Sequence, residues 1–387
     1  MVGIGTETAF EAAARARALE ATGRDVIHLE IGEPDFDTPA NIRAAAKRAL
    51  DDGWTHYGPP LGLPALREAI AEDASKRKGF AVDPASVVVT PGAKPIMFIA
   101  LLSLIEPGDE VIYPDPGFPI YESMTRYAGG TPVPIALTMD NDFRMDPAEI
   151  RAAVTDRTRL IIFNSPHNPT GAVLAADDIA AIADIARERD ISVLADEIYG
   201  RILYEGEHHS IAALPDMPQR TIVLDGFSKT FAMTGWRLGY AIVPDWLIEP
   251  YTKMIINSVS CTSSFSQIAA AEALTGPQDA VDEMLAEFRQ RRSLLVDGLN
   301  EIPGVRCAMP RGAFYSFPNI AGTGLSGSEV ADRLLYDAGV CVLSGSAFGH
   351  VGRDHLRISY ANSQANLRRA LERIGEVVAA LPAAAPA

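Results

Sequence analysis

The chain has 387 residues, of which 48% are apolar and 22% are charged, and its formal net charge at pH 7 is -16. This composition is that of a globular protein with a substantial core, and it argues against wholesale disorder. The acidic balance, with a pI near 4.9, argues against nucleic acid or an anionic membrane as the partner. It does not constrain a small substrate, because a site can be locally basic on an acidic protein.

The cysteines and the apolar runs indicate where such a protein would reside. Cys261, Cys307 and Cys341 are far apart and show neither metal-ligand nor redox spacing, so we expect free thiols in a reducing compartment. The N-terminus lacks the basic start and apolar core of a signal peptide. The longest apolar run, residues 96–105, is about half as long as a membrane span. A soluble cytoplasmic protein without a bound metal is expected.

From about residue 60 to residue 280, amphipathic helical segments alternate with short strands. Leu66, Ile70 and Ala74 recur at the spacing of one helical face. Seven runs rich in β-branched residues predict strands, and several are apolar throughout, as in a sheet covered by helices on both faces. This alternation predicts an α/β fold with an open, mostly parallel, seven-stranded sheet. The predicted strands are residues 87–90, 110–114, 133–137, 160–164, 192–195, 221–224 and 238–243.

After about residue 280 the pattern changes to that of a smaller α+β domain. An apolar stripe from Leu285 to Ile302 predicts a long helix, and short strands are predicted at residues 313–317, 340–343 and 356–360. A closing helix carries a stripe from Leu367 to Val378, with Ser363 as its N-cap. We predict a large domain of residues 44–280 and a small domain formed by residues 1–43 together with residues 281–387.

Lys229 has the most unusual setting in the chain. It stands in the run Gly226-Phe227-Ser228-Lys229-Thr230, just after a predicted apolar strand. Considered alone, it is most simply a surface lysine in a turn. A nearly buried amine in such a place is what Schiff-base chemistry requires, either with a carbonyl or with pyridoxal phosphate.

A second run has the features of a phosphate-binding turn. Thr90-Pro91-Gly92-Ala93-Lys94-Pro95 follows a predicted strand and leads into an apolar helix. Small residues let the backbone approach a phosphate, and a helix N-terminus offers free N–H groups and the positive end of the helix dipole. The backbone amides of Ala93 and Lys94 are therefore candidate phosphate ligands, and Arg237 could add a charge-assisted fork.

Five motifs follow one another along the chain. They are Gly32-Glu33-Pro34-Asp35-Phe36, Asn168-Pro169-Thr170-Gly171, Asp196-Glu197-Ile198-Tyr199, Ser228-Lys229 with Arg237, and Arg357-Ile358-Ser359-Tyr360. Together they resemble the class I pyridoxal-phosphate-dependent aminotransferases of fold type I, in the subgroup that includes bacterial aspartate aminotransferases. The resemblance covers most of the chain. It implies a homodimer with shared active sites that moves the amino group of an L-amino acid to a 2-oxo acid, with 2-oxoglutarate as the expected acceptor.

The resemblance also implies a role for each cofactor-binding residue. Lys229 would bind the cofactor through its amine and then move the substrate's proton, and Asp196 would face the ring nitrogen, where a carboxylate keeps that nitrogen protonated. An N-cap of a following helix is the alternative for Asp196. The other implied contacts are Tyr199 and Asn168 at the phenolic oxygen, Phe118 on the ring, Ala93, Lys94, Ser228 and Arg237 around the phosphate, and Tyr57 at the phosphate of the neighbouring subunit.

On the substrate side, Arg357 interrupts a strand pattern in which an apolar residue would pack better. A guanidinium fork suits bidentate capture of a substrate α-carboxylate. Gly32 is similar to the glycine whose backbone approaches that carboxylate, and Asn168 is expected beside it. Lys94 stands where some aspartate-using relatives carry a lysine that meets the distal carboxylate, although a lysine pointing outward fits the sequence equally well. The amino donor therefore stays open, with aspartate as one candidate.

The sequence departs from the family pattern at Gly226, where many relatives carry a phosphate-binding serine three residues before the lysine. Ser228 or Thr230 could compensate. Two other functions are compatible with the fold: a cysteine-conjugate β-lyase, which uses the same cofactor groups, and a non-catalytic cofactor-binding regulator. The absence of a basic stripe disfavours the regulator.

Two further polar groupings are interpreted as solvated surface. Ser75 and Lys78 have the spacing of a penicillin-binding active site, but its companion motifs are missing. His208 and His209 lie in a charged run, Glu-Gly-Glu-His-His, with no ligand set around them.

Overall fold

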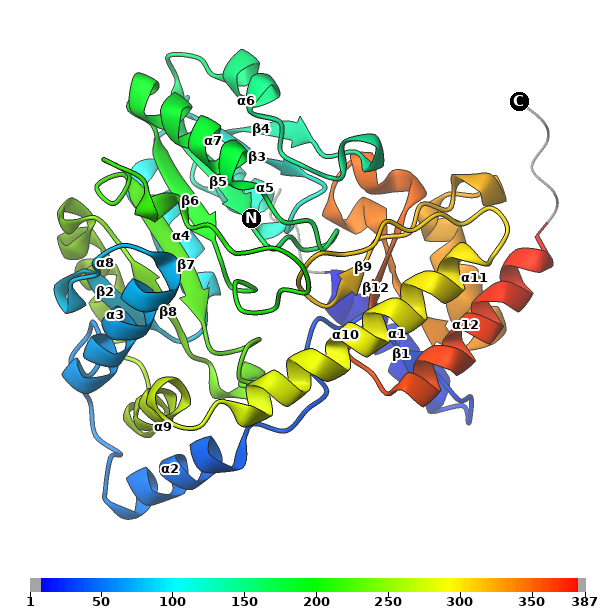
Figure 1. Cartoon of the computed structure of the whole chain (residues 1–387), viewed down its shortest axis with the longest axis horizontal. Coiled ribbons are helices and arrows are strands. Elements are labelled where there is room, and N and C mark those ends of the chain that lie inside the picture. The colour runs from blue at the N-terminus through cyan, green and yellow to red at the C-terminus, as the bar shows by residue number, and fades with distance from the viewer. Residues whose placement is uncertain (1–7, 382–387) are drawn as a thin grey trace.

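The computed structural model describes residues 8–381, which are arranged around one large sheet and two small ones (Figure 1). The large sheet has the strand order β2-β8-β7-β6-β5-β3-β4. Only β8 runs antiparallel to its neighbours, β2 and β7. The predicted α/β class with a seven-stranded, mostly parallel sheet is thus confirmed. The strands are β2 Val87–Thr90, β3 Glu110–Asp115, β4 Thr131–Ala136, β5 Thr158–Asn164, β6 Ser192–Asp196, β7 Thr221–Gly226 and β8 Gly239–Ile242.

Helices cover both faces of the large sheet, which explains why its central strands are apolar throughout. In β5, Leu160 and Ile162 pack into the cluster that contains the apolar face of α4. Ile161 and Phe163 point the other way and pack into the cluster that contains α7. Successive side chains of a strand alternate between faces, so both sets must be apolar. The helices around this sheet are α2 Ala40–Asp51, α3 Pro64–Lys78, α4 Lys94–Leu104, α5 Ile120–Tyr127, α6 Pro147–Ala153, α7 Ala176–Arg189, α8 Asp245–Ser258 and α9 Ser264–Thr275.

The N-terminal segment and the last third of the chain form a second group of elements. Ile27 in β1 pairs with Val340 in β10, which joins the N-terminal segment to the last third of the chain. The long helix α10 runs from the large sheet toward α11 and α12 (yellow in Figure 1). As predicted, Ser363 caps the closing helix by accepting a hydrogen bond from the Asn366 amide at 3.2 Å. The elements are α1 Thr8–Glu20, β1 Ile27–His28, α10 Asp279–Asn300, β9 Tyr315–Ser316, α11 Gly327–Ala338, β10 Val340–Cys341, β11 Leu343–Ser344, β12 Leu356–Ser359 and α12 Gln364–Ala379.

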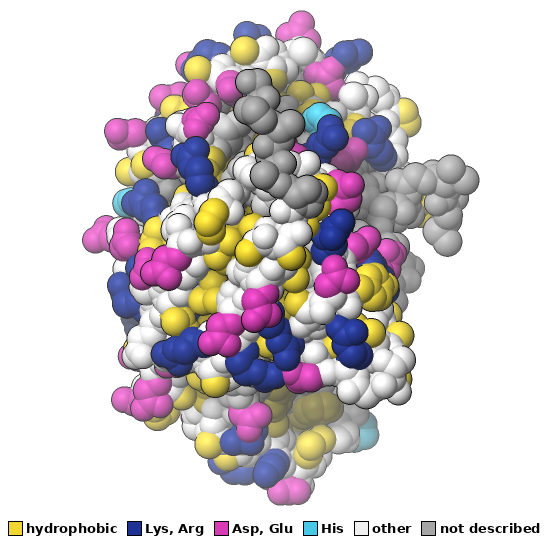
Figure 2. All heavy atoms as spheres, turned by 90° about the vertical axis from the view of Figure 1, so that its right-hand side faces the viewer, with side chains coloured by type: hydrophobic (Ala, Val, Ile, Leu, Met, Phe, Trp, Pro, Cys, Tyr) yellow, Lys and Arg dark blue, Asp and Glu magenta, His cyan; other side chains and the backbone are white. Residues whose placement is uncertain are grey.

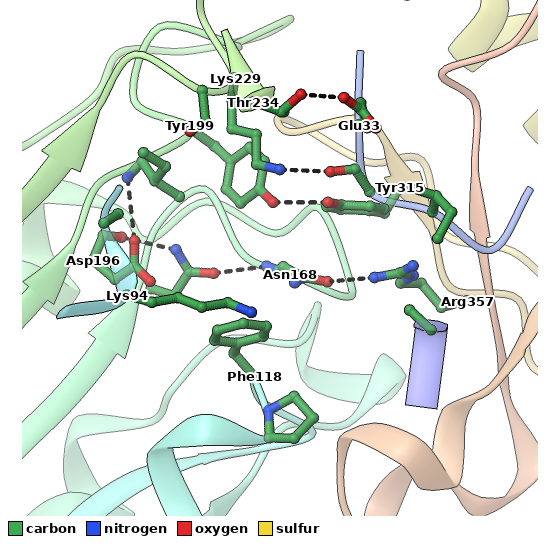
Figure 3. Close-up of a pocket in the computed structure, with 18 of the residues that line it drawn as sticks. Glu33, Lys94, Phe118, Asn168, Asp196, Tyr199, Lys229, Thr234, Tyr315 and Arg357 are labelled. Carbon is green, nitrogen blue, oxygen red and sulfur yellow. Dashed lines mark hydrogen bonds between the residues drawn. The ribbon is translucent and has the colours of Figure 1, made fainter. Parts of the chain in front are cut away.

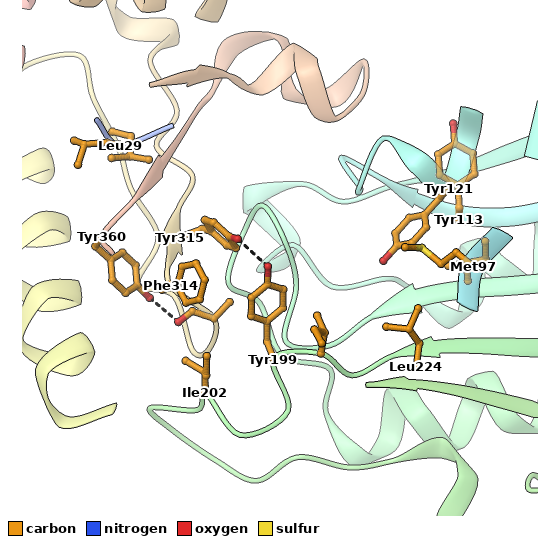
Figure 4. Packing of buried hydrophobic residues seen from close by; sticks show 14 of the residues in the cluster. Leu29, Met97, Tyr113, Tyr121, Tyr199, Ile202, Leu224, Phe314, Tyr315 and Tyr360 are labelled. Atoms are coloured by element: carbon orange, nitrogen blue, oxygen red, sulfur yellow. Dashed lines mark hydrogen bonds between the residues drawn. The ribbon is translucent and has the colours of Figure 1, made fainter. Parts of the chain in front are cut away.

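One apolar cluster crosses from the large sheet into the second group (Figure 4). It includes Met97 and Leu224 on the sheet side and Leu29, Phe314 and Tyr360 on the other. This shared core fixes the relative position of the two groups. The domain boundaries at residues 43/44 and 280/281 stay a prediction, and the terminal residues of the small domain, 1–7 and 382–387, lie outside the described range.

The surface of the second group carries interspersed acidic and basic side chains (Figure 2). Between residues 8 and 381, no helix is both long enough and apolar enough to span a bilayer. The three cysteines are free thiols, as expected, and Cys307 and Cys341 are buried.

Candidate active site

A cavity of about 550 Å³ opens beyond the carboxyl ends of β5, β6 and β7, where open α/β sheets bind ligands. The start of α1 and the loop around Gly32 line its opposite side. Of the predicted site residues, all but Tyr57 line this cavity, and Figure 3 shows how several of them lie. Those lining it are Gly32, Ala93, Lys94, Phe118, Asn168, Asp196, Tyr199, Ser228, Lys229, Arg237 and Arg357.

Lys229 lies in the turn after β7 and points across the cavity (Figure 3). Its Nζ donates a hydrogen bond of 2.5 Å to the carbonyl oxygen of Gly32. Its side chain is partly buried, and Nζ lies 5.8 Å from the centre of the Phe314 ring. The amine therefore faces the cavity, which contradicts the simple interpretation as a solvated turn lysine.

Asp196 is the last residue of β6 and is 5% exposed. Its Oδ2 accepts a hydrogen bond of 2.7 Å from the Tyr121 hydroxyl, and its Oδ1 accepts one of 3.2 Å from the Ile198 amide. Burial raises its pKa to about 6, opposed by these two donors. The N-cap alternative is wrong, because a turn and not a helix follows β6. A carboxylate in this environment can accept a hydrogen bond from a protonated ring nitrogen.

Tyr199 and Asn168 connect the two sides of the cavity. The Tyr199 hydroxyl lies 2.7 Å from that of Tyr315, and burial raises the pKa of Tyr199 well above its ordinary value. The Asn168 Oδ1 accepts a hydrogen bond from Arg357 Nη1 at 3.5 Å. Both side chains are buried. Two hydrogen-bonded pairs, Tyr199 with Tyr315 and Asn168 with Arg357, therefore join the sheet side of the cavity to the opposite side.

Arg357, on β12, is 4% exposed. Its guanidinium donates to the carbonyl oxygen of Glu30 and lies 4.7 Å from the centre of the Tyr315 ring and 5.0 Å from that of Phe348. Gly32 lies against the same tyrosine, because a Cβ on Gly32 would stand 2.2 Å from Tyr315 Oη. A side chain there would displace the tyrosine, so this position requires glycine.

A helix N-terminus and a guanidinium lie together where the sequence predicts a phosphate. Ala93 is the N-cap of α4, and Arg237 packs against Gly92, on which a Cβ would stand 2.3 Å from Arg237 Nη2. The guanidinium and the helix N-terminus therefore face the same space. A serine at Gly226 would be crowded, since its Cβ would stand 3.0 Å from the Gly239 Cα.

Of the two residues that could compensate for this missing serine, Ser228 lines the cavity. Thr230 is buried and is not among the lining residues. Taken together, a buried carboxylate, a cavity-facing lysine and a guanidinium beside a helix N-terminus fit a ring that carries a nitrogen, a carbonyl and a phosphate.

Lys94 also faces the cavity. Its Nζ lies 5.7 Å from the centre of the Phe118 ring and 6.0 Å from that of Phe10. The alternative of an outward-pointing lysine is wrong. A cation between aromatic faces on a cavity wall is available for an anionic group of a ligand.

The sequence motifs missed several side chains that build the site. Tyr121 binds Asp196, Tyr315 binds Tyr199, and Phe348 and Phe10 supply aromatic faces. None of them lies in one of the five motifs. Tyr121, three residues after Phe118, was the only one that proximity to a predicted residue could have indicated.

The interpretation of Lys78 and His208 as solvated surface is wrong. Lys78 is 3% exposed, because its Nζ binds the carboxylates of Glu197 and Asp225 in the interior. The His208 side chain is 8% exposed and lies against Glu197. Ser75 takes no part in this cluster and donates to the Ala71 carbonyl oxygen instead. In the described part of the chain, no group of three or more His, Cys, Asp or Glu side chains could hold a metal ion.

Comparison with known proteins gives a consistent result. The profile of class I and II aminotransferases matches residues 24–374. An aspartate aminotransferase of Pyrococcus abyssi is 45% identical over 359 residues, which cover 92% of each chain. Among solved structures, aspartate aminotransferase from Thermus thermophilus with maleate gives a TM-score of 0.93 at 40% identity, with 97% of each chain covered. Aromatic aminotransferase from Pyrococcus horikoshii gives 0.90 at 45% identity, covering 95% of this chain and 98% of that one.

Proposed function

We propose a substrate class for this chain. The chain belongs to the class I and II aminotransferases and is a pyridoxal-phosphate-dependent enzyme. It moves amino groups between amino acids and 2-oxo acids, and the relatives do not favour the β-lyase or the regulator. The finer proposal is that the donor is a dicarboxylic amino acid such as aspartate, with 2-oxoglutarate as the acceptor. A cytoplasmic location remains a prediction.

We assign the residues of the cavity the following roles. Bound pyridoxal phosphate supplies an aldehyde that takes up the amino group and a ring that accepts electrons. Lys229 is the attachment residue and moves the proton released at the substrate Cα. Asp196 accepts a hydrogen bond from the ring nitrogen, and Tyr199 and Asn168 donate to the phenolic oxygen. Arg237, Ser228 and the amides of Ala93 and Lys94 hold the phosphate.

The substrate proposal rests on two cations that face one cavity. Arg357 and Lys94 both line it, one from β12 and one from the start of α4. Two cations suit a substrate with two carboxylates, with Arg357 binding the α-carboxylate and Lys94 the distal one. The Thermus thermophilus aminotransferase, whose solved structure contains maleate, a dicarboxylate, supports this proposal.

An aromatic amino acid is the second candidate. The aromatic faces of Phe10, Phe118 and Phe348 line the same cavity, and a substrate ring could pack against them. The 45% identity to an aromatic aminotransferase of Pyrococcus horikoshii supports this alternative.

Lys94→Ala separates the two candidates. It leaves the backbone amide of residue 94 in place and removes only the ammonium. For a dicarboxylic donor, we expect kcat/KM for aspartate to fall about 10- to 100-fold, as for loss of a charged hydrogen bond, with kcat/KM for phenylalanine unchanged or higher. The exposed Lys253 provides the matched control, Lys253→Ala. An unchanged ratio of the two kcat/KM values would reject the distal-carboxylate role.

We also propose that the enzyme is a homodimer in which Tyr57 reaches the partner's phosphate site. Tyr57 is 90% exposed and does not line the cavity of its own chain. Sedimentation at micromolar concentration should give twice the chain mass. Tyr57→Phe should weaken cofactor retention without changing that mass, and a monomeric wild type with full cofactor affinity would exclude the proposal.

A further inference from the structure

A buried charged cluster lies directly behind the proposed cofactor side of the cavity. Lys78, the last residue of α3, donates from Nζ to Glu197 Oε2 at 2.6 Å and to Asp225 Oδ2 at 2.9 Å. The Lys78 and Glu197 side chains are fully buried, and that of Asp225 is 7% exposed. Three charges held this far from water are costly unless each is paired. A buried ion pair is often no more stabilising than apolar residues of the same size, so stability alone does not explain these three charged side chains.

Each carboxylate also has polar neighbours besides Lys78. Ser210 Oγ donates to Glu197 Oε1 at 2.7 Å, and His208 Nε2 lies 2.9 Å from Glu197 Oε2. Tyr240 donates its hydroxyl to Asp225 Oδ2 at 3.0 Å. Glu197 is ionised. Burial alone would raise its pKa, but Lys78 and His208 outweigh burial and keep the pKa below its usual range.

This cluster is built onto the two strand ends that carry the site. Glu197 directly follows Asp196, and its amide donates to the Leu224 carbonyl oxygen of β7 at 2.8 Å. Asp225 Oδ1 accepts from the Gly226 amide at 2.7 Å, three residues before Lys229. Lys78 therefore ties the end of β6 to the end of β7 through one ammonium.

The cluster also sets the charge around Asp196. Glu197 and Asp225 each raise the pKa of Asp196 by repulsion, in addition to the larger effect of burial. Lys78 binds both carboxylates, so its positive charge is placed to oppose theirs. The titratable and charged groups facing Asp196 or this cluster include Tyr121 of α5, Asp73, Arg77 and Lys78 of α3, Tyr199, Arg201 and His208 after β6, Asp225 of β7 and Tyr240 of β8.

We propose that Lys78 is a positioning residue for transamination, which neutralises Glu197 and Asp225 so that Asp196 stays ionised toward the cofactor's ring nitrogen. This inference rests on the role of Asp196 proposed above. Lys78 touches neither substrate nor cofactor and acts through its two carboxylate partners.

Reconstitution of the apoprotein with pyridoxal phosphate across a pH series tests the inference by affinity and not by turnover. Affinity should decline as pH falls through the titration of Asp196. Lys78→Met leaves two unneutralised carboxylates and should move the midpoint of this decline up by about one pH unit. Glu197→Gln leaves Lys78 with a single carboxylate and should move the midpoint down. The double variant should return it toward the wild-type value.

Shifts of opposite sign distinguish an electrostatic role from a loss of packing. If Lys78→Met and Glu197→Gln shift the midpoint in the same direction, or if folded Glu197→Gln does not shift it, the inference is wrong. Glu197→Gln carries the test by itself if Lys78→Met does not fold. The matched control is Arg291→Met, which removes a buried cation from between two other carboxylates, Asp35 and Glu287, and should leave the midpoint in place.

Asp196→Asn separates this inference from the proposed function. If Asp196→Asn leaves the pH dependence of cofactor affinity unchanged, the assigned role of Asp196 fails, and the inference about Lys78 fails with it. If Asp196→Asn abolishes the pH dependence while the Lys78 and Glu197 variants behave as wild type, only the inference about Lys78 fails.

Discussion

The two sides of the cavity hold their charged groups by different means. On the sheet side, Asp196 is held at a strand end and backed by a second layer of buried charges around Lys78. On the other side, Arg357 is held by a backbone carbonyl and two aromatic faces. The sheet side therefore depends on electrostatics in a dry interior, whereas the opposite side depends on shape and on fixed backbone groups. The effects of substitutions on the two sides should therefore differ in kind and not only in size.

The largest effect should come from Lys229→Ala, which removes the only amine proposed for both attachment and proton transfer. Loss of a general base alone lowers rates by about 10²- to 10⁴-fold, and loss of the attachment residue adds to this. We expect transamination to fall by about 10⁴-fold or more in single-turnover measurements. Lys229→Arg keeps the charge and should be equally inactive. Substantial turnover by either variant would contradict the assignment.

Arg357→Lys should affect the substrate and spare the cofactor. Lysine keeps the charge but cannot form a bidentate fork or stack on Tyr315. We expect kcat/KM for every amino acid donor to fall by about 10²- to 10³-fold, as when a bidentate charged contact is lost, with the affinity for pyridoxal phosphate unchanged. Equilibrium titration of the apoprotein with cofactor provides that control. Weakened cofactor binding would show that the two sides are not separable.

Local sequence patterns were sufficient to predict much of the fold and of the candidate site. The strands of the large sheet were predictable because most are short runs rich in β-branched and other apolar residues. Many cavity-lining residues were predictable because they lie in the five motifs or in the turn before α4. Partners from distant segments were not predictable. The sequence pattern wrongly predicts a solvated Lys78, because its two carboxylate partners lie 119 and 147 residues further along the chain. Tyr315 was missed for the same reason, since its hydroxyl partner, Tyr199, is 116 residues away.

Asp196→Asn should stabilise the apoprotein while impairing the enzyme. The pKa of Asp196 in the folded state is raised to about 6, above its ordinary value near 4. The folded apoprotein therefore loses stability from this group as pH rises from about 4 to about 6. Asparagine removes that loss, so the free energy of unfolding at pH 8 should increase by about 3 kcal/mol. Urea unfolding of the cofactor-free protein at pH 4 and pH 8 measures this increase in unfolding free energy. An equal increase at the two pH values would contradict the explanation.

The smallest effect should come from two buried histidines, His167 on the sheet side and His355 on the other. His167 precedes Asn168 after β5, and burial lowers its pKa to about 3, whereas the pKa of His355 beside Phe317 is lowered by burial to about 4. The unfolded chain takes up a proton near pH 6.5 that folded His167 cannot, so stability is lost as pH falls below 6.5. At pH 5 this loss is about 2 kcal/mol.

His167→Gln should remove that loss, so the difference in unfolding free energy between pH 7 and pH 5 should shrink by about 2 kcal/mol. The Thr170 hydroxyl lies 2.8 Å from His167 Nδ1 in the wild type, and a change in this contact acts at both pH values, so it does not alter the difference. The exposed His56 supplies the control, His56→Gln, which should leave the difference unchanged. His355→Gln should give nearly the same change, because its folded pKa of about 4 also lies below pH 5. An unchanged difference in the His167→Gln variant would contradict the expected cost of protonating this buried imidazole.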